Sequence, residues 1–179
     1  MERMPTLSAD VAGASAIRPC VSQTGSRSTR PRLASHNFQV MMRLRVVRRI
    51  RWTVLAITDE RGRSPVIAFL EDLSRAGGAD AAQLQALLTL VARSGPPYNE
   101  QRSRQLDGPV WEFKTRGGIR IPYFHDEGMI VICTEALREP KRAELRRVTR
   151  RALTLYDDYQ SAKRAGDVSV LDCVLEEEE

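Results

Sequence analysis

Arg116, Arg120 and His125 form the first group of residues in this 179-residue sequence whose types suit chemistry on a phosphate. A guanidinium binds phosphate through paired, charge-assisted hydrogen bonds, and an imidazole with a pKa near ~6.5 exchanges protons at neutral pH. The group therefore predicts two phosphate contacts and one acid or base. The alternative for His125 is a solvated residue at the end of a hairpin strand.

A second group of cations lies where the last predicted strand meets the last predicted helix. Arg138, Lys141 and Arg142 stand together there, and Arg146 and Arg150 continue the charge along one helix face. The N-terminus of a helix offers free N–H groups to an anion, and nearby cations strengthen that attraction. We expect this group to contact phosphates, and the alternative is a solvated helix face.

Strand periodicity limits which of these residues act together. Alternate residues of a strand share a face, so Arg120 and Tyr123 reach one face only if Pro122 sits at a bulge. We place Arg120 on the open face of the sheet, where it contacts phosphate or pairs with Glu112 across the hairpin. Glu135, at the end of the last strand, acts as a base or pairs with Arg120, and we favour the structural pair.

The elements that position these residues follow from turn signals and hydrophobic spacing. Residues 52–57 are rich in β-forming side chains and predict a first strand. A helix begins with Ser64 as its N-cap and a proline at its first position. Asp80 caps a second helix, which ends at Gly95.

Three short β-runs follow at residues 110–114, 119–124 and 129–133, separated by short turns that contain glycine. Such turns join consecutive hairpins. Pro122 cannot donate a ladder hydrogen bond, so we expect it to face away from a neighbouring strand or to sit at a bulge. An amphipathic helical pattern then runs from about 140 to 166.

The order of these elements predicts the fold class. A strand, two helices, a three-stranded antiparallel meander and a C-terminal helix indicate an α+β fold in which helices back a curved sheet.

Charge divides the chain into three segments. Residues 1–50 carry nine arginines against two acidic residues, and residues 167–179 carry six acidic residues and no base. We therefore expect a disordered basic extension at 1–41, a folded domain at 42–166 and an acidic flexible tail beyond it. The simplest origin of the extension is a start of translation assigned too early.

Composition excludes several classes of protein. The three cysteines are odd in number and show no metal or redox spacing, and two histidines do not suffice for a zinc cluster. No run of about eighteen apolar residues is present, so a membrane span is not expected. We predict a cytoplasmic protein that needs no metal and no other cofactor.

Three segments together resemble the RelE/ParE superfamily of toxins, most closely its HigB-like, phage-derived branch. They are RQLDGPVWEFK at 104–114, GIRIPY at 118–123 and IVICT at 130–134. Members of the family typically have a basic residue and Leu before a Leu-Trp-Glu-Leu-Arg strand, and then an Arg-Ile/Val-x-Tyr strand. The likeness covers roughly residues 52–166 and implies a RelE-like fold.

The resemblance also implies a function. HigB-like members are toxins of type II toxin–antitoxin systems that cleave mRNA, commonly on the ribosome, by attack of the 2′-hydroxyl without a metal. Their partners would be mRNA, the ribosome and an antitoxin, often a helix-turn-helix DNA-binding protein. Such cleavage needs a base, an acid and positive charge at the phosphorus. The residues assigned to catalysis are Arg120, His125, Arg138 and Lys141. The residues assigned to RNA binding are Arg116, Arg142, Arg146 and Arg150.

The chain departs from the family after its last strand. Where the family often has Thr-His-Gly-Phe-x-Lys, Glu135 replaces the histidine and Glu139 replaces the lysine. Three other functions therefore remain open. They are a catalytically decayed protein that binds only RNA or an antitoxin, a ParE-like inhibitor of DNA gyrase, and a phage-derived protein with a regulatory role.

Overall fold

The computed structural model describes residues 41–171, so most of the predicted N-terminal extension and residues 172–179 of the predicted tail lie outside the described part. The helices are α1 (Pro65–Ala76), α2 (Ala79–Ser94) and α3 (Arg142–Ala165). The strands are β1 (Met42–Arg49), β2 (Thr53–Ile57), β3 (Ser103–Asp107), β4 (Val110–Lys114), β5 (Ile119–Asp126), β6 (Ile130–Cys133), β7 (Leu137–Arg138) and β8 (Val168–Leu171).

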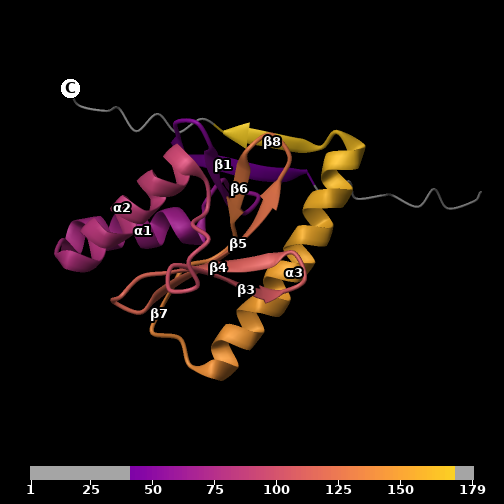
Figure 1. Ribbon diagram of the computed structural model, residues 1–179. Coiled ribbons are helices and arrows are strands. Elements are labelled where there is room, and N and C mark those ends of the chain that lie inside the picture. Colours follow the sequence, from indigo (N-terminus) through magenta and orange to yellow (C-terminus); the bar gives the residue numbers. More distant parts are fainter. Residues whose placement is uncertain (1–40, 172–179) are drawn as a thin grey trace, which may run out of the picture. The chain divides into compact units, whose positions relative to one another are not determined.

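All eight of these strands belong to one mixed sheet (Figure 1). The order across the sheet is β3-β4-β5-β6-β2-β1-β8, and the short β7 pairs with β5 beside the end of β6. The pairs β1–β8 and β2–β6 are parallel, and the other pairs are antiparallel.

The predicted fold class is therefore wrong. The expected RelE-like arrangement contained one strand and a three-stranded antiparallel meander, whereas the structure has an eight-stranded mixed sheet with three helices. The meander is present as β4, β5 and β6, but it is only the middle of this larger sheet.

The missed strands are short or strongly charged. In β1 the apolar side chains of Met42, Leu44 and Val46 alternate with arginines, and the three apolar residues are buried. That alternation is a strand pattern, but the first strand was expected only at residues 52–57, and the arginines of residues 42–49 were counted with the basic charge of the N-terminal segment. Residues 168–171, assigned by charge to a flexible tail, form β8 and pair in parallel with β1.

The helices cover both faces of the sheet. One face packs against α1 and α2 through a core that includes Val54, Phe113 and Tyr123. The opposite face packs against α3 through a core that includes Leu55, Phe124 and Tyr159. Figure 1 shows α1 and α2 on one side of the strands and the long α3 on the other. Alternate residues of one strand therefore reach different helical layers.

Two local expectations for α1 and α2 have different outcomes. Ser64 is the N-cap of α1, its hydroxyl accepts a hydrogen bond from the Ile67 amide, and a proline follows it. Asp80 does not cap α2, because Gly78 occupies the N-cap position and Asp80 lies in the first turn.

Pro122 lies in a regular part of β5 and not at a bulge. The register between β4 and β5 runs without a shift through the Glu112–Pro122 pair. On its other side Pro122 faces the gap between β6 and β7, where the amide and hydroxyl of Thr134 donate to its carbonyl oxygen. Pro122 therefore has no ladder partner in β6 or β7, and its missing N–H breaks no hydrogen bond of the sheet, which agrees with the expectation that it faces away from a neighbouring strand.

None of the helices among residues 41–171 combines the length and the apolar character that a membrane crossing requires.

Candidate functional site

A fully buried carboxylate organises the cations of β3 and β5. Glu112, on β4, accepts hydrogen bonds at its Oε1 atom from Arg104 at 2.8 Å and from Arg120 at 2.7 Å. The Glu112 side chain is 0% exposed, and its Oε2 atom has no hydrogen-bond partner among the described residues. Two guanidinium groups thus compensate one buried charge, which is the condition under which a carboxylate tolerates burial.

Arg120 therefore has the structural partner that the sequence offered as the alternative to phosphate. Its side chain is 31% exposed and lies on the sheet face that α3 covers, not on an open face. Pairing with Arg120 was the favoured role for Glu135, and that interpretation is wrong because Glu112 makes the ion pair with Arg120.

Arg138 is also paired. Its guanidinium donates to Asp80 at 2.9 Å and so connects β7 to the first turn of α2. The nearby turn between β4 and β5, which carries Arg116, packs tightly here, because a Cβ atom on Gly117 would lie 1.8 Å from the Asp80 carboxylate. The Glu139 amide closes the same turn by donating to Gly118.

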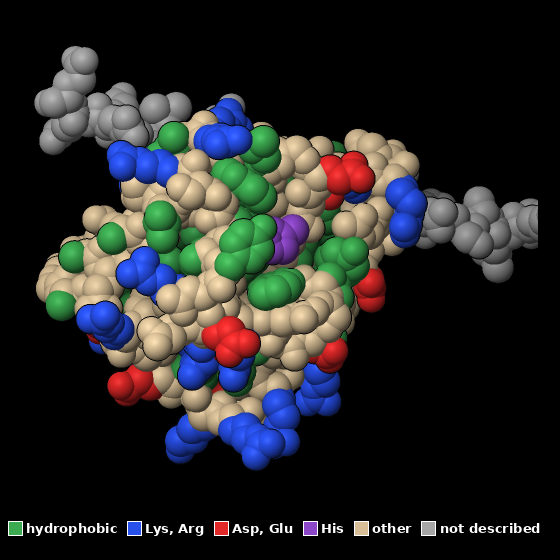
Figure 2. Space-filling model, in the orientation of Figure 1, with side chains coloured by type: hydrophobic (Ala, Val, Ile, Leu, Met, Phe, Trp, Pro, Cys, Tyr) green, Lys and Arg blue, Asp and Glu red, His purple; other side chains and the backbone are tan. Residues whose placement is uncertain are grey.

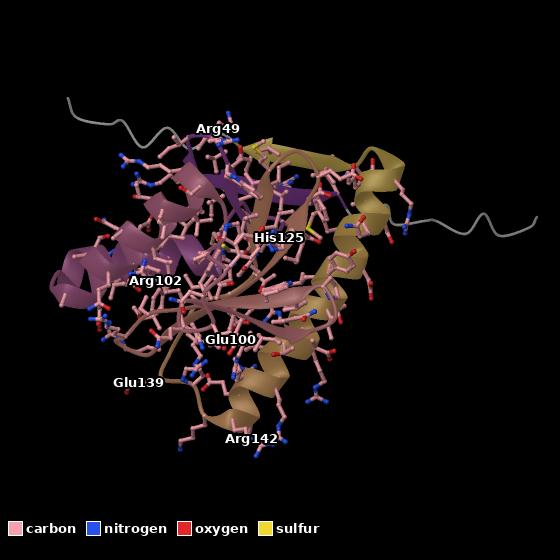
Figure 3. All side chains as sticks on the ribbon, in the orientation of Figure 1. Arg49, Glu100, Arg102, His125, Glu139 and Arg142 are labelled. Carbon is pink, nitrogen blue, oxygen red and sulfur yellow. The ribbon has the colours of Figure 1, made fainter. Side chains whose placement is uncertain are left out.

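The start of α3 presents the other predicted cations to solvent. Lys141, Arg142, Arg146 and Arg150 are all exposed, and none of them makes an ion pair with a described residue. Figure 3 labels Arg142 at the lower end of the view, and Figure 2 shows Lys and Arg side chains gathered at that end. This surface is basic, and none of these four residues lines either of the two pockets described below.

His125 lies on the opposite face of β5 from Arg120, beside an aromatic pocket. Its ring contacts Trp111 and Tyr123 edge to face, with ring centroids 6.1 and 5.3 Å apart. Trp52 and Tyr98 complete the aromatic lining of a cavity of about 480 Å³. Figure 2 shows the imidazole in purple at the surface, with hydrophobic side chains on either side.

The environment of this pocket tunes two titratable groups. Partial burial lowers the pKa of His125 below 6.5, because the imidazolium form loses hydration. Burial raises the pKa of Tyr123 above its usual value of 10, although the hydrogen bond that its hydroxyl shares with Ser103 at 2.7 Å opposes this shift. His125 is therefore a neutral imidazole at pH 7, and Tyr123 is a neutral phenol.

A second, basic pocket lies between α2 and the ends of the β3–β5 strands. Its volume is about 660 Å³, and its cations are Arg102, Lys114 and Arg116. Its other lining residues are apolar or neutral, with no carboxylate among them. Within residues 41–171 these three side chains make no ion pair, so their charge is directed at solvent or a ligand.

One loop separates the two pockets. Residues 95–102 connect α2 to β3, and Pro97 lines both cavities. Glu100 contributes to the aromatic pocket and Arg102 to the basic pocket (Figure 3). A ligand that crosses this loop would meet aromatic rings and a neutral imidazole on one side and three cations on the other.

The structure does not gather the four residues assigned to catalysis. Arg120 and His125 lie on opposite faces of β5, Arg138 pairs with Asp80, and Lys141 precedes α3. Of the residues assigned to RNA binding, Arg116 enters the basic pocket, while the others line the exposed face of α3.

Sequence reasoning missed most of the residues that line the pockets. Trp52 and Trp111 were not among the residues assigned to a site, and both are half-buried in the wall of the aromatic pocket. Tyr98 is fully exposed, and Gly-Pro-Pro before it marked only the end of a helix. The sequence offered one local signal, an aromatic residue at position 98 that is followed by the polar and charged residues 99–102.

Neither a scan against models of known protein families nor a search of curated proteins finds a match to this chain.

Proposed function

We propose that this protein binds single-stranded RNA across the loop at residues 95–102. The observation that carries the proposal is the position of the aromatic pocket directly beside the basic pocket. Proteins that bind single strands combine cations along the backbone with aromatic side chains on which unpaired bases stack. A duplex hides its bases, so the aromatic pocket favours a single strand.

The charges around the two pockets support a strand whose bases lie in the aromatic pocket and whose phosphates lie in the basic pocket. Arg102, Lys114 and Arg116 have no acidic partner among the described residues, so a phosphate would not have to displace an existing ion pair. Arg120 and Arg138 are already paired with carboxylates and would lose those bonds. The backbone contacts in this proposal therefore belong to the basic pocket.

Within the same proposal the protein is the toxin of a toxin–antitoxin pair and cleaves mRNA. The motif resemblance to HigB-like toxins supports this reaction class, and His125 supplies the proton acceptor. The neutral imidazole takes the proton of a 2′-hydroxyl, the 2′-oxygen attacks the adjacent phosphorus, and the bond to the 5′-oxygen breaks as that oxygen takes a proton from water. Cations of the basic pocket stabilise the charge on the phosphorane.

A binding protein without nuclease activity is the second candidate. The observation in its favour is that Arg120 and Arg138 are neutralised by Glu112 and Asp80 instead of converging on His125. Such a protein would hold RNA or an antitoxin at the same surface and leave the strand intact.

A binding assay followed by product analysis tests both candidates. The full chain is titrated against a fluorescent single-stranded RNA of mixed sequence and against the same sequence as a duplex. We expect tighter binding of the single strand, and we expect a charge-matched double variant, Arg102→Ala with Lys114→Ala, to bind it more weakly than a control, Arg142→Ala with Arg146→Ala. Equal binding of single strand and duplex, or no binding, would refute the proposal.

Cleavage is read on the same mixtures by resolving the RNA products. Fragments with 2′,3′-cyclic phosphate ends that His125→Gln no longer produces support the nuclease. Binding that survives in the absence of any fragment, with and without ribosomes, supports the second candidate.

A further inference from the structure

The aromatic pocket has the features of a site for one particular nucleobase. We propose that it binds an unstacked guanine, with the Glu100 carboxylate accepting hydrogen bonds from the Watson–Crick edge of the base. This inference rests on the proposed binding of single-stranded RNA and names the base that the site selects.

The walls of the pocket suit a flat ring. Trp52 immediately precedes β2, Trp111 lies on β4, and Tyr98 comes from the loop between α2 and β3. Trp52 is held in place from behind, because its ring lies against Gly95 and its amide donates to Ala92. A ring fixed in this way, as that of Trp52 is, stacks on a base without first losing rotamer freedom.

The polar edge of the pocket selects among the bases. Glu100 lies in a turn fixed by Asn99, whose carbonyl accepts from the Arg102 amide and whose side chain accepts from the Gln101 amide. The Glu100 carboxylate has no hydrogen-bond or ion-pair partner among residues 41–171. A carboxylate that carries a charge is an acceptor only, so it binds a ligand that presents donors.

Guanine is the base that matches this requirement. Its N1–H and N2–H groups lie side by side and can meet the two oxygens of one carboxylate. Adenine and cytosine each place a ring-nitrogen acceptor next to their amino group, and uracil flanks its N3–H with two carbonyl oxygens. Those acceptors would repel the Glu100 carboxylate, which gives discrimination against three of the four bases.

The position of the basic pocket agrees with a nucleotide ligand. Pro97 lines both cavities, so a base in the aromatic pocket has its own sugar and phosphate near the loop that leads to Arg102. An apolar peptide side chain would fill the same volume but would leave the carboxylate and the imidazole without hydrogen-bond partners.

Intrinsic fluorescence reports directly on this pocket. The sequence contains two tryptophans, Trp52 and Trp111, and both line the aromatic pocket. A stacked base should therefore quench the whole tryptophan signal of the full-length protein. Guanosine, adenosine, cytidine and uridine 5′-monophosphates, together with inosine 5′-monophosphate, are titrated against the full chain at low salt.

The expected result is saturable quenching with the lowest dissociation constant for the guanosine nucleotide. Two matched hydrogen bonds give discrimination of roughly 5- to 150-fold over a mismatched base. Inosine lacks the N2 amino group and should fall between guanosine and adenosine. Glu100→Gln should abolish the preference for guanosine, because the amide loses the charged acceptor pair for guanine and gains a donor that binds the ring nitrogen of adenine. Adenosine binding should therefore become tighter in this variant. Glu139→Gln, an exposed carboxylate that lines neither pocket, should behave as the wild type (Figure 3).

Each other outcome overturns the inference in a recognisable way. Equal quenching by all the nucleotides, in the wild type and in Glu100→Gln alike, would mean that the pocket stacks bases without distinguishing among them. No quenching by any nucleotide, in a protein that still binds single-stranded RNA, would remove the base site and keep the proposed function. Guanosine-selective quenching without RNA binding would keep the base site and remove the proposed function.

Discussion

The guanidinium of Arg120 donates to Oε1 of the fully buried Glu112 at 2.7 Å, across two neighbouring strands of the sheet. Arg104 donates to the same oxygen from the edge strand β3. The three side chains join β3, β4 and β5 on the face covered by α3, so the conspicuous arginine of the second strand motif acts as a counter-ion within the fold.

Removing that counter-ion should lower stability more than RNA affinity. Arg120→Ala leaves Glu112 buried with Arg104 as its remaining partner, and we expect a loss of about 2–3 kcal/mol in the free energy of unfolding. Urea denaturation measures the loss, and Arg164→Ala, an exposed arginine near the end of α3, serves as the control. An Arg120→Ala protein of unchanged stability but much weaker RNA binding would restore the phosphate contact that the sequence suggested.

Local patterns in the sequence predicted much of the secondary structure. The expected elements at 52–57, 110–114 and 119–124 correspond to β2, β4 and β5, and a helix does begin at Ser64. These elements carry their signals within a few residues: β-branched runs, turn glycines and a helix cap. Such signals depend only on neighbouring residues, so they can be recognised in the sequence without knowledge of the fold.

The sheet could not be predicted because its extra strands depend on distant partners. The edge strand β3 has little apolar character, and its residues become a strand by pairing with β4. In the same way β8 forms beside β1, which precedes it by more than a hundred residues. Context of this kind overrides local propensity in strands.

The candidate site was predicted only in part, because its ion pairs also depend on residues that are distant in the sequence. Arg116 and His125 do line pockets, but charge alone could not show that Arg120 and Arg138 are consumed by Glu112 and Asp80. An arginine that binds a carboxylate and one that binds a phosphate are identical in sequence. Only the packing of the strands decides between them.

The salt dependence of RNA binding should identify the face that contacts the backbone. Each phosphate contact to a single strand contributes about 0.7 to the slope of log K against log salt concentration. The triple variant Arg102→Ala, Lys114→Ala, Arg116→Ala should therefore lower the magnitude of this slope by about 2. Fluorescence anisotropy at several salt concentrations measures it.

A second triple variant, of Arg142, Arg146 and Arg150 to alanine, removes the same charge from α3 and is the matched control. We expect a smaller change in slope for it. If only the α3 variant changes the slope, the backbone lies on α3 and the basic pocket is not the binding site.

Stability at acid pH should depend on Asp126. Burial by itself would raise the pKa of this carboxyl, but hydrogen bonds from Lys163 at 2.7 Å and Tyr159 at 2.6 Å outweigh burial and hold the pKa below its usual value of 3.8. A carboxyl with a lowered pKa in the folded state stabilises the fold above its unfolded pKa, and this contribution is lost as pH falls through the folded pKa.

Urea midpoints measured between pH 7 and pH 2.5 test this linkage. Asp126→Asn should be less stable than the wild type at pH 7, and the two proteins should converge at the acid end. Asp157→Asn, which changes an exposed carboxyl of α3 without a side-chain partner in the described part of the chain, should follow the wild-type curve. A constant gap between Asp126→Asn and the wild type across the range would contradict the assigned ion pair.

The close contact between Gly95 and Trp52 makes the aromatic pocket sensitive to a single methyl group. Gly95 has φ of +84°, and a Cβ atom there would lie 2.7 Å from the Trp52 ring. Gly95→Ala therefore adds a clash with a fixed aromatic ring to the cost of a left-handed backbone. Gly128→Ala, at φ of +76° with no atom within 4 Å of the added carbon, pays the backbone cost alone.

We expect Gly128→Ala to lower the free energy of unfolding by about 1 kcal/mol and Gly95→Ala to lower it by about 2–4 kcal/mol. Only Gly95→Ala should also shift the tryptophan emission of the native protein, because it alone displaces a pocket ring. Since the rings of Trp52 and Trp111 face the same cavity, that displacement should weaken nucleotide quenching as well. Equal stabilities and unchanged emission for the two variants would mean that Trp52 moves freely, and a freely moving ring could not form a preorganised wall for a base.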